Sequence, residues 1–564
     1  MNFKEILSKE IKIEGVTPEE LEKLFTIPPN LQMGDFALPC FSFAKIQKCS
    51  PAVIAQNIAK DMQSIEIVDH IDVVNGYLNI FLNKKVATNI ILNELLNKQD
   101  LCSREIGKGK LFCIDYSSIN VAKNPHIGHF SNTVIGASIA RLYEKMGYNV
   151  KRLNYLGDYG TQFGKLVCAY QKWATKEDVE KRGIEYLQEL YIRVNTECET
   201  DENLLAECRE TFKKMEEKEP EITALFEWFK KLSIEEVKKD VYEPLKITFD
   251  DWRGEQYYSQ FTPAIFEELD KKHITKISQG ATIVDLEEYG LGVAIVKQSN
   301  GTTLYLTRDI ATAIERYKEY KFDKCIYITG VEQKIHFEQL FKILELMGKE
   351  WSKNLIHIAN GRLRLPEGKL SSRKGSQALI KDIFVNAINK ATELIQSRDT
   401  NSTVDKQKAQ DIGIGALIFS ALKSGVTKDS VFVLEDALNF DGETGPYLMY
   451  THARCASILR KFDKDITKID AKTISTDDEI SWELVSCMNK FNAIVFDAYN
   501  NNEPSFVARY LIELATIFNK FYHDNRILGE DETKTLKNVT ITYLVEKILK
   551  EGLSILGIVA PEEM

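Results

Sequence analysis

Two histidines and a glycine, His126, Gly128 and His129, follow an apolar stretch at residues 111–116. An amphipathic stretch at 132–146 comes next, so the expected order is strand, loop and helix. A loop in this position places donors at a helix N-terminus, where a phosphate can bind. The two imidazoles can donate hydrogen bonds to an α-phosphate, and a residue without a side chain leaves room for a base.

Two other interpretations of the histidine pair compete with phosphate binding. A metal ion held by both rings needs a third ligand, and the sequence offers none at a recognisable spacing. A capping turn with solvent-facing imidazoles is the second interpretation. Because the segment lies between a strand and a helix, we favour nucleotide binding by His126, Gly128 and His129.

A second segment rich in anion donors lies far downstream, between Gly368 and Gly375. Its polar residues are Lys369, Ser371, Ser372, Arg373 and Lys374. Flexible lysines between glycines can close over a triphosphate and neutralise the leaving pyrophosphate. A solvated turn is the alternative, and the histidine segment upstream favours the catalytic interpretation.

The elements around these segments predict three domains. Residues 1–105 are expected to form a small α+β domain, in which a helix begins near Gly34. Residues 106–410 are expected to form a Rossmann-type α/β domain with a parallel sheet and a charged helical insertion near 175–245. Residues 411–564 have the pattern of an all-α domain.

The composition of the 564-residue chain limits its class. With 44% hydrophobic residues it can bury several cores, and it has no apolar run long enough to span a bilayer. Ten cysteines without a C-x-x-C pair argue against zinc knuckles and disulfides, and they favour the cytoplasm. The net charge of −10 argues against nonspecific nucleic-acid binding, although lysines can still gather on one face.

The two donor-rich segments, in this order, resemble the two signature motifs of class I aminoacyl-tRNA synthetases. A closer resemblance, to the arginyl-tRNA synthetase family, extends over nearly the whole chain. Its most specific stretches are residues 117–129, 157–164, 301–309 and 439–447.

The resemblance implies a pocket for the arginine substrate made of Ser118, Asn120, Glu255, Tyr305, Asp309 and Gln333. Glu255 and Asp309 would face the guanidinium, because paired acceptors best recognise a planar group with five donors. Ser118 and Asn120 would contact the α-amino end. A helix N-cap is a competing role for Asp309, and a place in the core is a competing role for Tyr305.

The resemblance also implies catalytic and nucleotide-binding roles. The catalytic residues would be His126, His129, Lys123, Lys369 and Lys374. The ATP-binding residues would be His126, Gly128, His129, Lys369, Ser371 and Ser372. The second signature usually carries a lysine where Ser372 stands, and in this family Lys123 is the expected substitute. Mg²⁺ would accompany ATP, and neither zinc nor another protein-bound metal is expected.

The activity that the resemblance implies is the attachment of arginine to tRNA. L-arginine and ATP would give arginyl-adenylate, and the arginyl group would pass to the 3′ end of tRNA-Arg. The all-α domain would bind the anticodon, residues 1–105 would contact the outer corner of the tRNA, and the protein would be a cytoplasmic monomer without a membrane partner. Adenylate formation would require bound tRNA. The alternatives are a class I synthetase for another amino acid, such as glutamate or lysine, and a non-catalytic tRNA-binding relative.

Overall fold

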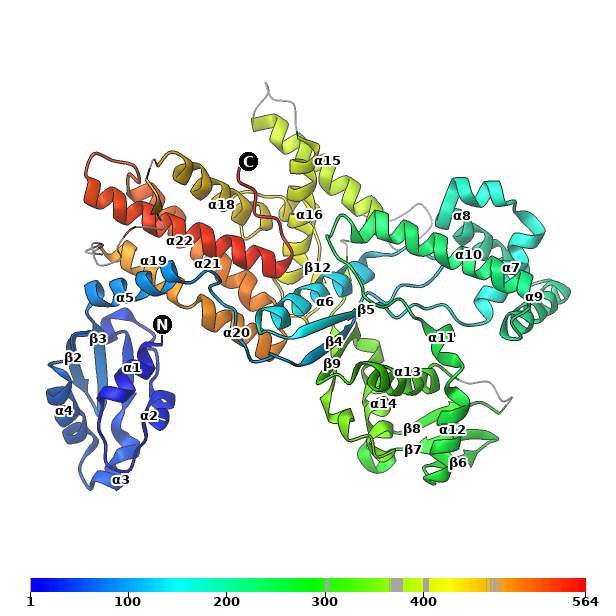
Figure 1. Ribbon diagram of the computed structural model, residues 1–564, viewed down its shortest axis with the longest axis horizontal. Helices are drawn as coiled ribbons and strands as arrows, with labels where there is room; N and C mark the ends of the chain where they lie inside the picture. The colour runs from blue at the N-terminus through cyan, green and yellow to red at the C-terminus, as the bar shows by residue number, and fades with distance from the viewer. Residues whose placement is uncertain are drawn as a thin grey trace.

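A four-stranded parallel sheet lies near the centre of the computed structural model, with separate lobes around it (Figure 1). Its strands, in the order β10-β9-β4-β5, are Leu355–Asn360, Lys324–Gly330, Leu111–Asp115 and Asn149–Leu153. All neighbouring strands are parallel, which confirms the Rossmann-type prediction. The structure describes residues 2–299, 304–364, 366, 379–398, 405–462, 464–466, 469, 474, 476 and 478–564.

The strand order creates a topological switch between β4 and β9. The chain passes from β4 to β5 on one side of the sheet, and β9 and β10 lie on the other side. The crevice outside the carboxyl ends of strands at such a switch is the usual ligand site of an open α/β sheet. Helix α6 (Ile127–Lys145) follows β4, and η5 (Val331–Gln333) and α14 (Lys334–Leu346) follow β9. Helix α13 (Tyr305–Tyr320) precedes β9, and the short 3₁₀ helix η6 (Glu350–Asn354) precedes β10.

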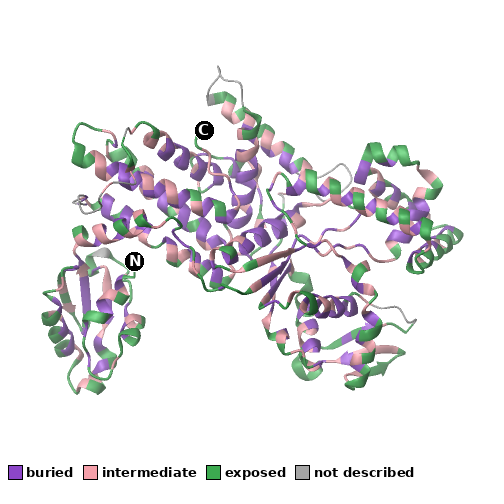
Figure 2. Ribbon diagram, in the orientation of Figure 1, coloured by how far each residue is buried: buried purple, intermediate pink, exposed green. Residues whose placement is uncertain are grey.

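Helix α6 begins earlier than the sequence pattern indicated. It starts at Ile127 because His126 caps it, and the chain turns away at Gly147, whose φ is +84°. One side of α6 faces the central sheet, and the other contacts three C-terminal helices, α16 (Lys406–Leu422), α20 (Phe491–Asn501) and α22 (Glu532–Leu556). Figure 2 shows buried residues along α6 and the helices around it. The helix that carries the histidines is therefore fixed on both sides.

The N-terminal lobe is a small α+β domain, as predicted, with an antiparallel sheet in the order β1-β3-β2. Its elements are α1 (Phe3–Glu10), α2 (Pro18–Leu24), η1 (Leu31–Met33), β1 (Phe36–Pro39), η2 (Cys40–Phe43), α3 (Ala44–Gln47), α4 (Pro51–Met62), β2 (Val68–Val74), β3 (Tyr77–Leu82) and α5 (Lys84–Asn97). The prediction of a helix near Gly34 was wrong, because the chain there pairs with β3. The Asp35 N–H donates to the Ile80 carbonyl at 2.9 Å, and β1 follows at once.

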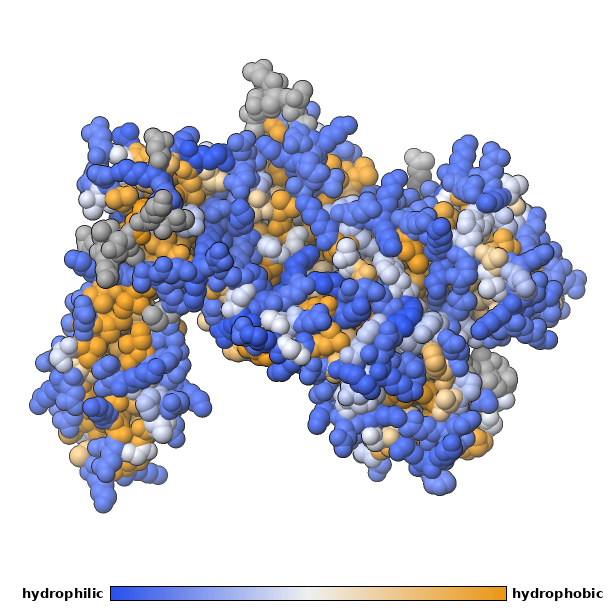
Figure 3. Space-filling view, in the orientation of Figure 1, coloured by the Kyte–Doolittle hydropathy of each residue, from blue (hydrophilic) through white to orange (hydrophobic). Residues whose placement is uncertain are grey.

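The predicted helical insertion forms a lobe with its own apolar core. It consists of α7 (Thr161–Trp173), α8 (Lys176–Glu197), α9 (Glu202–Glu216), α10 (Pro220–Val237) and the π-helical turn η3 (Lys238–Tyr242). The outer surface of this lobe is mostly hydrophilic in Figure 3, at the right of the view.

A second insertion was not predicted from the sequence. It contains α11 (Glu255–Ser259), α12 (Thr262–Lys271), η4 (Glu287–Tyr289) and an antiparallel sheet of β6 (Thr275–Ser278), β7 (Ala281–Asp285) and β8 (Val293–Lys297).

The C-terminal part is helical, as predicted. Its elements are α15 (Ile380–Arg398), α16 (Lys406–Leu422), α17 (Leu434–Ala437), α18 (Gly445–Arg460), α19 (Glu479–Asn489), α20 (Phe491–Asn501), α21 (Ser505–Asp524) and α22 (Glu532–Leu556). A two-residue strand, β12 (Ser430–Val431), pairs with β11 (Leu363–Arg364). Within the described residues, no helix is long and apolar enough to cross a membrane.

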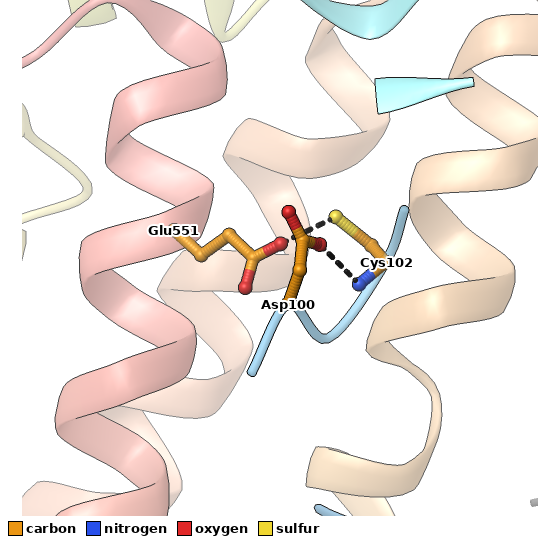
Figure 4. A group of neighbouring side chains, drawn as sticks. All are labelled: Asp100, Cys102 and Glu551. Carbon is orange, nitrogen blue, oxygen red and sulfur yellow. Dashed lines mark hydrogen bonds between the residues drawn. The ribbon is translucent and has the colours of Figure 1, made fainter. Parts of the chain in front are cut away.

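A polar cluster joins the N-terminal linker to α6 and α22. Figure 4 shows three of its members, Asp100, Cys102 and Glu551. The Cys102 thiol donates a hydrogen bond to the Glu551 carboxylate at 2.8 Å. Lys145, at the end of α6, contacts Asp100 at 2.6 Å and Glu551 at 3.0 Å. The ammonium thus supplies the positive charge for both carboxylates. Burial, followed by the charge of Glu551, raises the pKa of the Cys102 thiol far above its usual range.

We expect Lys145→Met to lower the thermal midpoint by about 3 °C and to speed proteolysis near residues 98–104, because the partly buried Glu551 and the more exposed Asp100 both lose their cation. Lys108→Met is the matched control. Lys108 pairs with Glu105, and their side chains are 71% and 77% exposed, respectively. Loss of this ion pair should therefore change the thermal midpoint by less than about 1 °C. Calorimetry and limited proteolysis measure both effects, and equal results for the two variants would contradict a role of the cluster in joining domains.

Candidate active site

The loop after β4 carries the first group of candidate residues and makes an unusual turn. Ser117, Ser118 and Ala122 all have positive φ, of 72°, 47° and 58°, in the left-handed region that non-glycine residues rarely occupy. Such strained positions persist only where the surrounding structure holds them, and they concentrate at functional sites. The loop is therefore held in a specific shape at the carboxyl end of β4.

Hydrogen bonds from neighbouring elements hold this shape. The Ser117 N–H donates to Asn132 Oδ1 at 2.6 Å, and Asn132 Nδ2 donates to the Ile328 carbonyl of β9 at 2.6 Å. The Ser117 hydroxyl also lies 2.7 Å from the Tyr242 hydroxyl. Asn132 thus joins the loop after β4 to β9, the neighbouring strand at the switch point, a role that sequence reasoning did not assign.

The two histidines form a reciprocal cap at the start of α6. The Gly128 N–H donates to His126 Nδ1 at 3.1 Å, and the His126 N–H donates to His129 Nδ1 at 3.3 Å. A Cβ at position 128 would lie only 3.0 Å from His126 Cε1. Glycine therefore allows the His126 ring to fold over the helix start. The capping turn in the alternative interpretation is present, but the rings are partly buried rather than solvent-facing.

The protonation state of both rings follows from this geometry. Burial lowers the pKa of His126, and burial with the charges of His126 and Lys123 lowers the pKa of His129 to about 3. Both rings are therefore neutral near pH 7. Because each Nδ1 accepts a hydrogen bond, the single ring proton resides on Nε2. Each histidine consequently presents one Nε2–H donor, which suits an anionic ligand.

The second donor-rich segment can be placed only through its flank. Lys369, Ser371, Ser372 and Lys374 lie outside the described residues. The first described residues after them contact the histidine loop, because the Ile380 N–H donates to the Pro125 carbonyl at 3.0 Å and Leu379 forms a β-bridge with His126. Leu379 and Ile380, which follow the lysine segment in the sequence, are therefore fixed beside the histidines.

Lys123 is exposed in the loop between β4 and α6, three residues before His126. Its ammonium lies 5.4 Å from the centre of the Tyr191 ring on α8. Asn120, earlier in the same loop, pairs with Gly157 in a parallel bridge. A Cβ on Gly157 would approach Asn120 Oδ1 to 2.3 Å and would displace the Asn120 amide. Lys123 and Asn120 both belong to the carboxyl end of β4.

Asp309 lies inside α13 and does not cap it. The helix runs from Tyr305 with Leu304 at its N-cap, so the competing helix-cap role for Asp309 is excluded. Asp309 Oδ2 instead lies 2.6 Å from His336 Nε2, on α14. Tyr305 is 57% exposed and its ring lies 4.9 Å from that of His336, so it is not a core residue either. Gln333 is exposed just before α14.

Glu255 is the second carboxylate of this region, and it is paired with Arg308. Arg308 Nε and a terminal nitrogen both lie 2.9 Å from Glu255 Oε2. Burial raises the pKa of Glu255 to about 7; the charge of Arg308 opposes this rise, and the charge of Asp309 adds to it. Glu255 and Asp309 therefore lie within electrostatic reach of each other. Neither Arg308 nor His336 was singled out by the sequence.

Ser118 connects this acidic region to the sheet. Its hydroxyl donates to Asp115 Oδ1 at 3.3 Å, and Asp115 Oδ2 pairs with the buried Arg316 of α13 at 2.5 Å. The charge of Asp309 also acts on the Asp115 carboxyl. Candidate residues from β4, α11 and α13 thus converge on one acidic region beside the histidine loop.

The fold and this site define a class of protein, and comparison with known proteins supports it. A family described as "tRNA synthetases class I (R), catalytic domain" matches residues 91–434. The "DALR anticodon binding domain" matches residues 448–564, and the "Arginyl tRNA synthetase N terminal domain" matches residues 1–82. The molecule is thus a class I aminoacyl-tRNA synthetase in its architecture.

Full-length relatives narrow the class to one family. The chain is 41% identical to "Arginine--tRNA ligase" of Alkaliphilus metalliredigens over all of both chains, and 41% identical to that of Clostridioides difficile over 98% of each. Arginyl-tRNA synthetase of Thermus thermophilus has the same fold, with a TM-score of 0.79, 22% identity and coverage of 100% and 99%. Arginyl-tRNA synthetase of Plasmodium falciparum gives a TM-score of 0.78 at 23% identity, with 96% of this chain and 94% of that chain covered. The chain belongs to the arginyl-tRNA synthetase family.

The histidine geometry gives a direct spectroscopic prediction. In ¹⁵N-detected NMR, both imidazoles should be neutral Nε2–H tautomers near pH 7, and His129 should stay neutral until the pH falls to about 4, because its pKa is lowered to about 3. The exposed His523 is an internal reference for an accessible ring. Protonation of His129 near pH 6.5, or an Nδ1–H tautomer, would contradict the capping geometry.

Proposed function

We propose that the protein is an arginine–tRNA ligase that activates L-arginine with ATP and transfers the arginyl group to the 3′ end of tRNA-Arg. The observation that carries the proposal is the convergence of two neutral Nε2–H donors with an acidic region at one switch point. Donors for an anionic phosphate and acceptors for a cationic side chain meet there. Full-length similarity to arginine–tRNA ligases supports the same conclusion.

In the first step the arginine carboxylate attacks the α-phosphorus of ATP, and pyrophosphate leaves. This chain needs no covalent intermediate, so its residues act by positioning and by stabilising negative charge. His126 and His129 donate from Nε2 to phosphate oxygens, and Lys123 supplies a positive charge. Lys369 and Lys374, with Ser371 and Ser372, supply further donors to the triphosphate, and Ile380, a few residues after them, contacts Pro125 before the histidines. Mg²⁺ enters with the triphosphate as part of the substrate.

In the pocket, the substrate guanidinium faces Asp309 and Glu255, with Tyr305 and Gln333 at the rim and Ser118 and Asn120 toward the amino end. A guanidinium suits paired carboxylates because it donates through a planar fork. A glutamate substrate would bring like charge to the acidic region, and a lysine substrate lacks the fork. In the second step a hydroxyl of the terminal tRNA ribose attacks the activated carbonyl, and AMP leaves.

The division of the chain follows from these roles. Residues 1–105 contact the tRNA, 106–410 carry the chemistry, and 411–564 bind the anticodon. The protein acts as a monomer in the cytoplasm, where ten free thiols are stable. Adenylate formation requires bound tRNA.

Pyrophosphate exchange with a panel of amino acids, with and without tRNA, tests the function. Exchange that occurs with arginine and with no other amino acid of the panel supports the function. Exchange only with another amino acid, or tRNA binding without any exchange, would refute it.

Asp309→Ala should raise the KM for arginine roughly 10- to 100-fold while changing the KM for ATP little, because it removes a charged acceptor from the guanidinium. Glu315→Ala is the control on the same helix, since Glu315 pairs with Lys318. Steady-state pyrophosphate exchange measures both constants. Equal changes in the two KM values for Asp309→Ala would remove Asp309 from arginine recognition.

Lys123→Ala should slow adenylate formation by on the order of 100-fold, because a donor to the transition-state charge is lost. Lys172→Ala is the control; Lys172 lies in the insertion and pairs with Glu207. Rapid-quench measurement of arginyl-adenylate gives the rate of the chemical step directly. An unchanged rate in Lys123→Ala would exclude this lysine from the mechanism.

A further inference from the structure

Three consecutive residues of the loop before the histidines are held by the helical insertion. The Ala122 N–H donates to Ser233 Oγ of α10 at 3.0 Å. Asn124 donates from its backbone N–H and its Nδ2 to Gln188 Oε1 of α8, both at 3.1 Å. The ammonium of Lys123, between them, lies 5.4 Å from the centre of the Tyr191 ring. The insertion thus contacts the loop at each residue from 122 to 124.

A kink fixes the part of α8 that makes these contacts. Gly183 departs from helical geometry with φ 60° and ψ −144°, and the helix resumes at Ile184. The Ile184 N–H donates to both carboxylate oxygens of Glu236 on α10, at 3.1 and 3.0 Å. A Cβ at position 183 would collide with that carboxylate at 1.5 Å, so the position requires glycine.

The resumed helix presents its loop-binding residues on one face. Ile184, Gln188 and Tyr191 are separated by four and three residues, the spacing of neighbours along one side of a helix. Because Glu236 caps this helix at Ile184, α10 sets the direction in which Gln188 and Tyr191 point. The same helix α10 also supplies Ser233 to the loop. Two helices of the insertion therefore act on the loop together.

Lysine is the residue that benefits most from such support. Its side chain is a flexible four-carbon stem that ends in a compact charge, so an unsupported lysine loses much rotamer freedom when it binds a ligand. An aromatic face within about 6 Å attracts the ammonium and limits the directions that it samples. Ala122, directly before it, has a φ of 58° that the Ser233 hydrogen bond helps to hold. Both the backbone and the side chain of Lys123 are preorganised from the insertion.

We propose that Gln188 and Tyr191 are positioning residues for Lys123, so that the helical insertion takes part in adenylate formation. This proposal rests on the proposed function. Gln188 holds the backbone on the C-terminal side of the lysine, and the ring of Tyr191 orients its ammonium toward the nucleotide. Neither residue contacts the substrates.

The first test compares variants of the intact enzyme in arginine-dependent pyrophosphate exchange at saturating tRNA. Tyr191→Leu should lower kcat about tenfold and change the KM for arginine by less than about twofold. Tyr191→Phe keeps the ring and should retain most of the rate. Tyr186→Leu is the matched control, since Tyr186 lies on the same helix but its ring faces Arg182, at 4.4 Å; it should leave kcat within about twofold. Equal losses in the two leucine variants would overturn the proposal.

A double-mutant cycle separates positioning from general stability. In a Lys123→Ala background, Tyr191→Leu should have an effect of less than about twofold, because the group that it positions is gone. A full tenfold loss in that background would overturn the proposal. If Tyr191→Leu does not fold, Gln188→Leu is tested in the same cycle with the same expected outcome. Absence of exchange in the wild-type protein would overturn the proposed function itself, whereas wild-type exchange with an additive cycle overturns only the role of Gln188 and Tyr191.

Discussion

The chain between β4 and α6 must turn sharply at the switch point, and the rest of the site depends on that turn. Ser117, Ser118 and Ala122 adopt left-handed backbone conformations that cost on the order of 1 kcal/mol each. Hydrogen bonds to Asn132, Tyr242 and Ser233 offset this cost, and they come from α6, η3 and α10. If these contacts were lost, the loop would relax, and the residues that it carries would leave the crevice.

The carboxylates of the site are supplied together with internal partners. Asp115 pairs with Arg316, Glu255 with Arg308, and Asp309 with His336. Burying an unpaired carboxylate would cost several kcal/mol or protonate the group. The charges of Arg308 and Arg316 oppose the rise that burial causes in the pKa of Glu255 and of Asp115. An incoming guanidinium then joins or replaces an existing partner, and the pocket does not have to hold bare charges before the substrate arrives.

Much of the central fold could be predicted because its strands and helices have clear periodic patterns. The parallel strands contain apolar runs at 111–114 and 325–328, and an amphipathic pattern indicated α6 although the helix begins earlier than the pattern did. Short strands were missed, including β1 and the β6–β8 sheet, because their pairing partners rather than their own residues decide their structure. Within the helical C-terminal part, α19 and α20 are separate helices that meet at Lys490.

The candidate site was predictable to the extent that its residues lie close together in the sequence. His126, Gly128 and His129 form their cap within four residues, so their spacing carried the information. The partners His336 and Arg308 lie 27 and 53 residues from the carboxylates that they contact, and nothing local indicates such pairs. The left-handed residues of the loop are serines and an alanine, which give no sequence signal for that conformation.

The kink at Gly183 also constrains how this family can diversify. A helical insertion on the surface of a domain usually tolerates exchange for another segment of similar length. Here Gly183 and Glu236 set the direction of the helix segment whose residues contact the loop before α6. Residues 123, 188 and 191 should therefore vary together among relatives, and a chimera with a foreign insertion would have to import its matching loop as well.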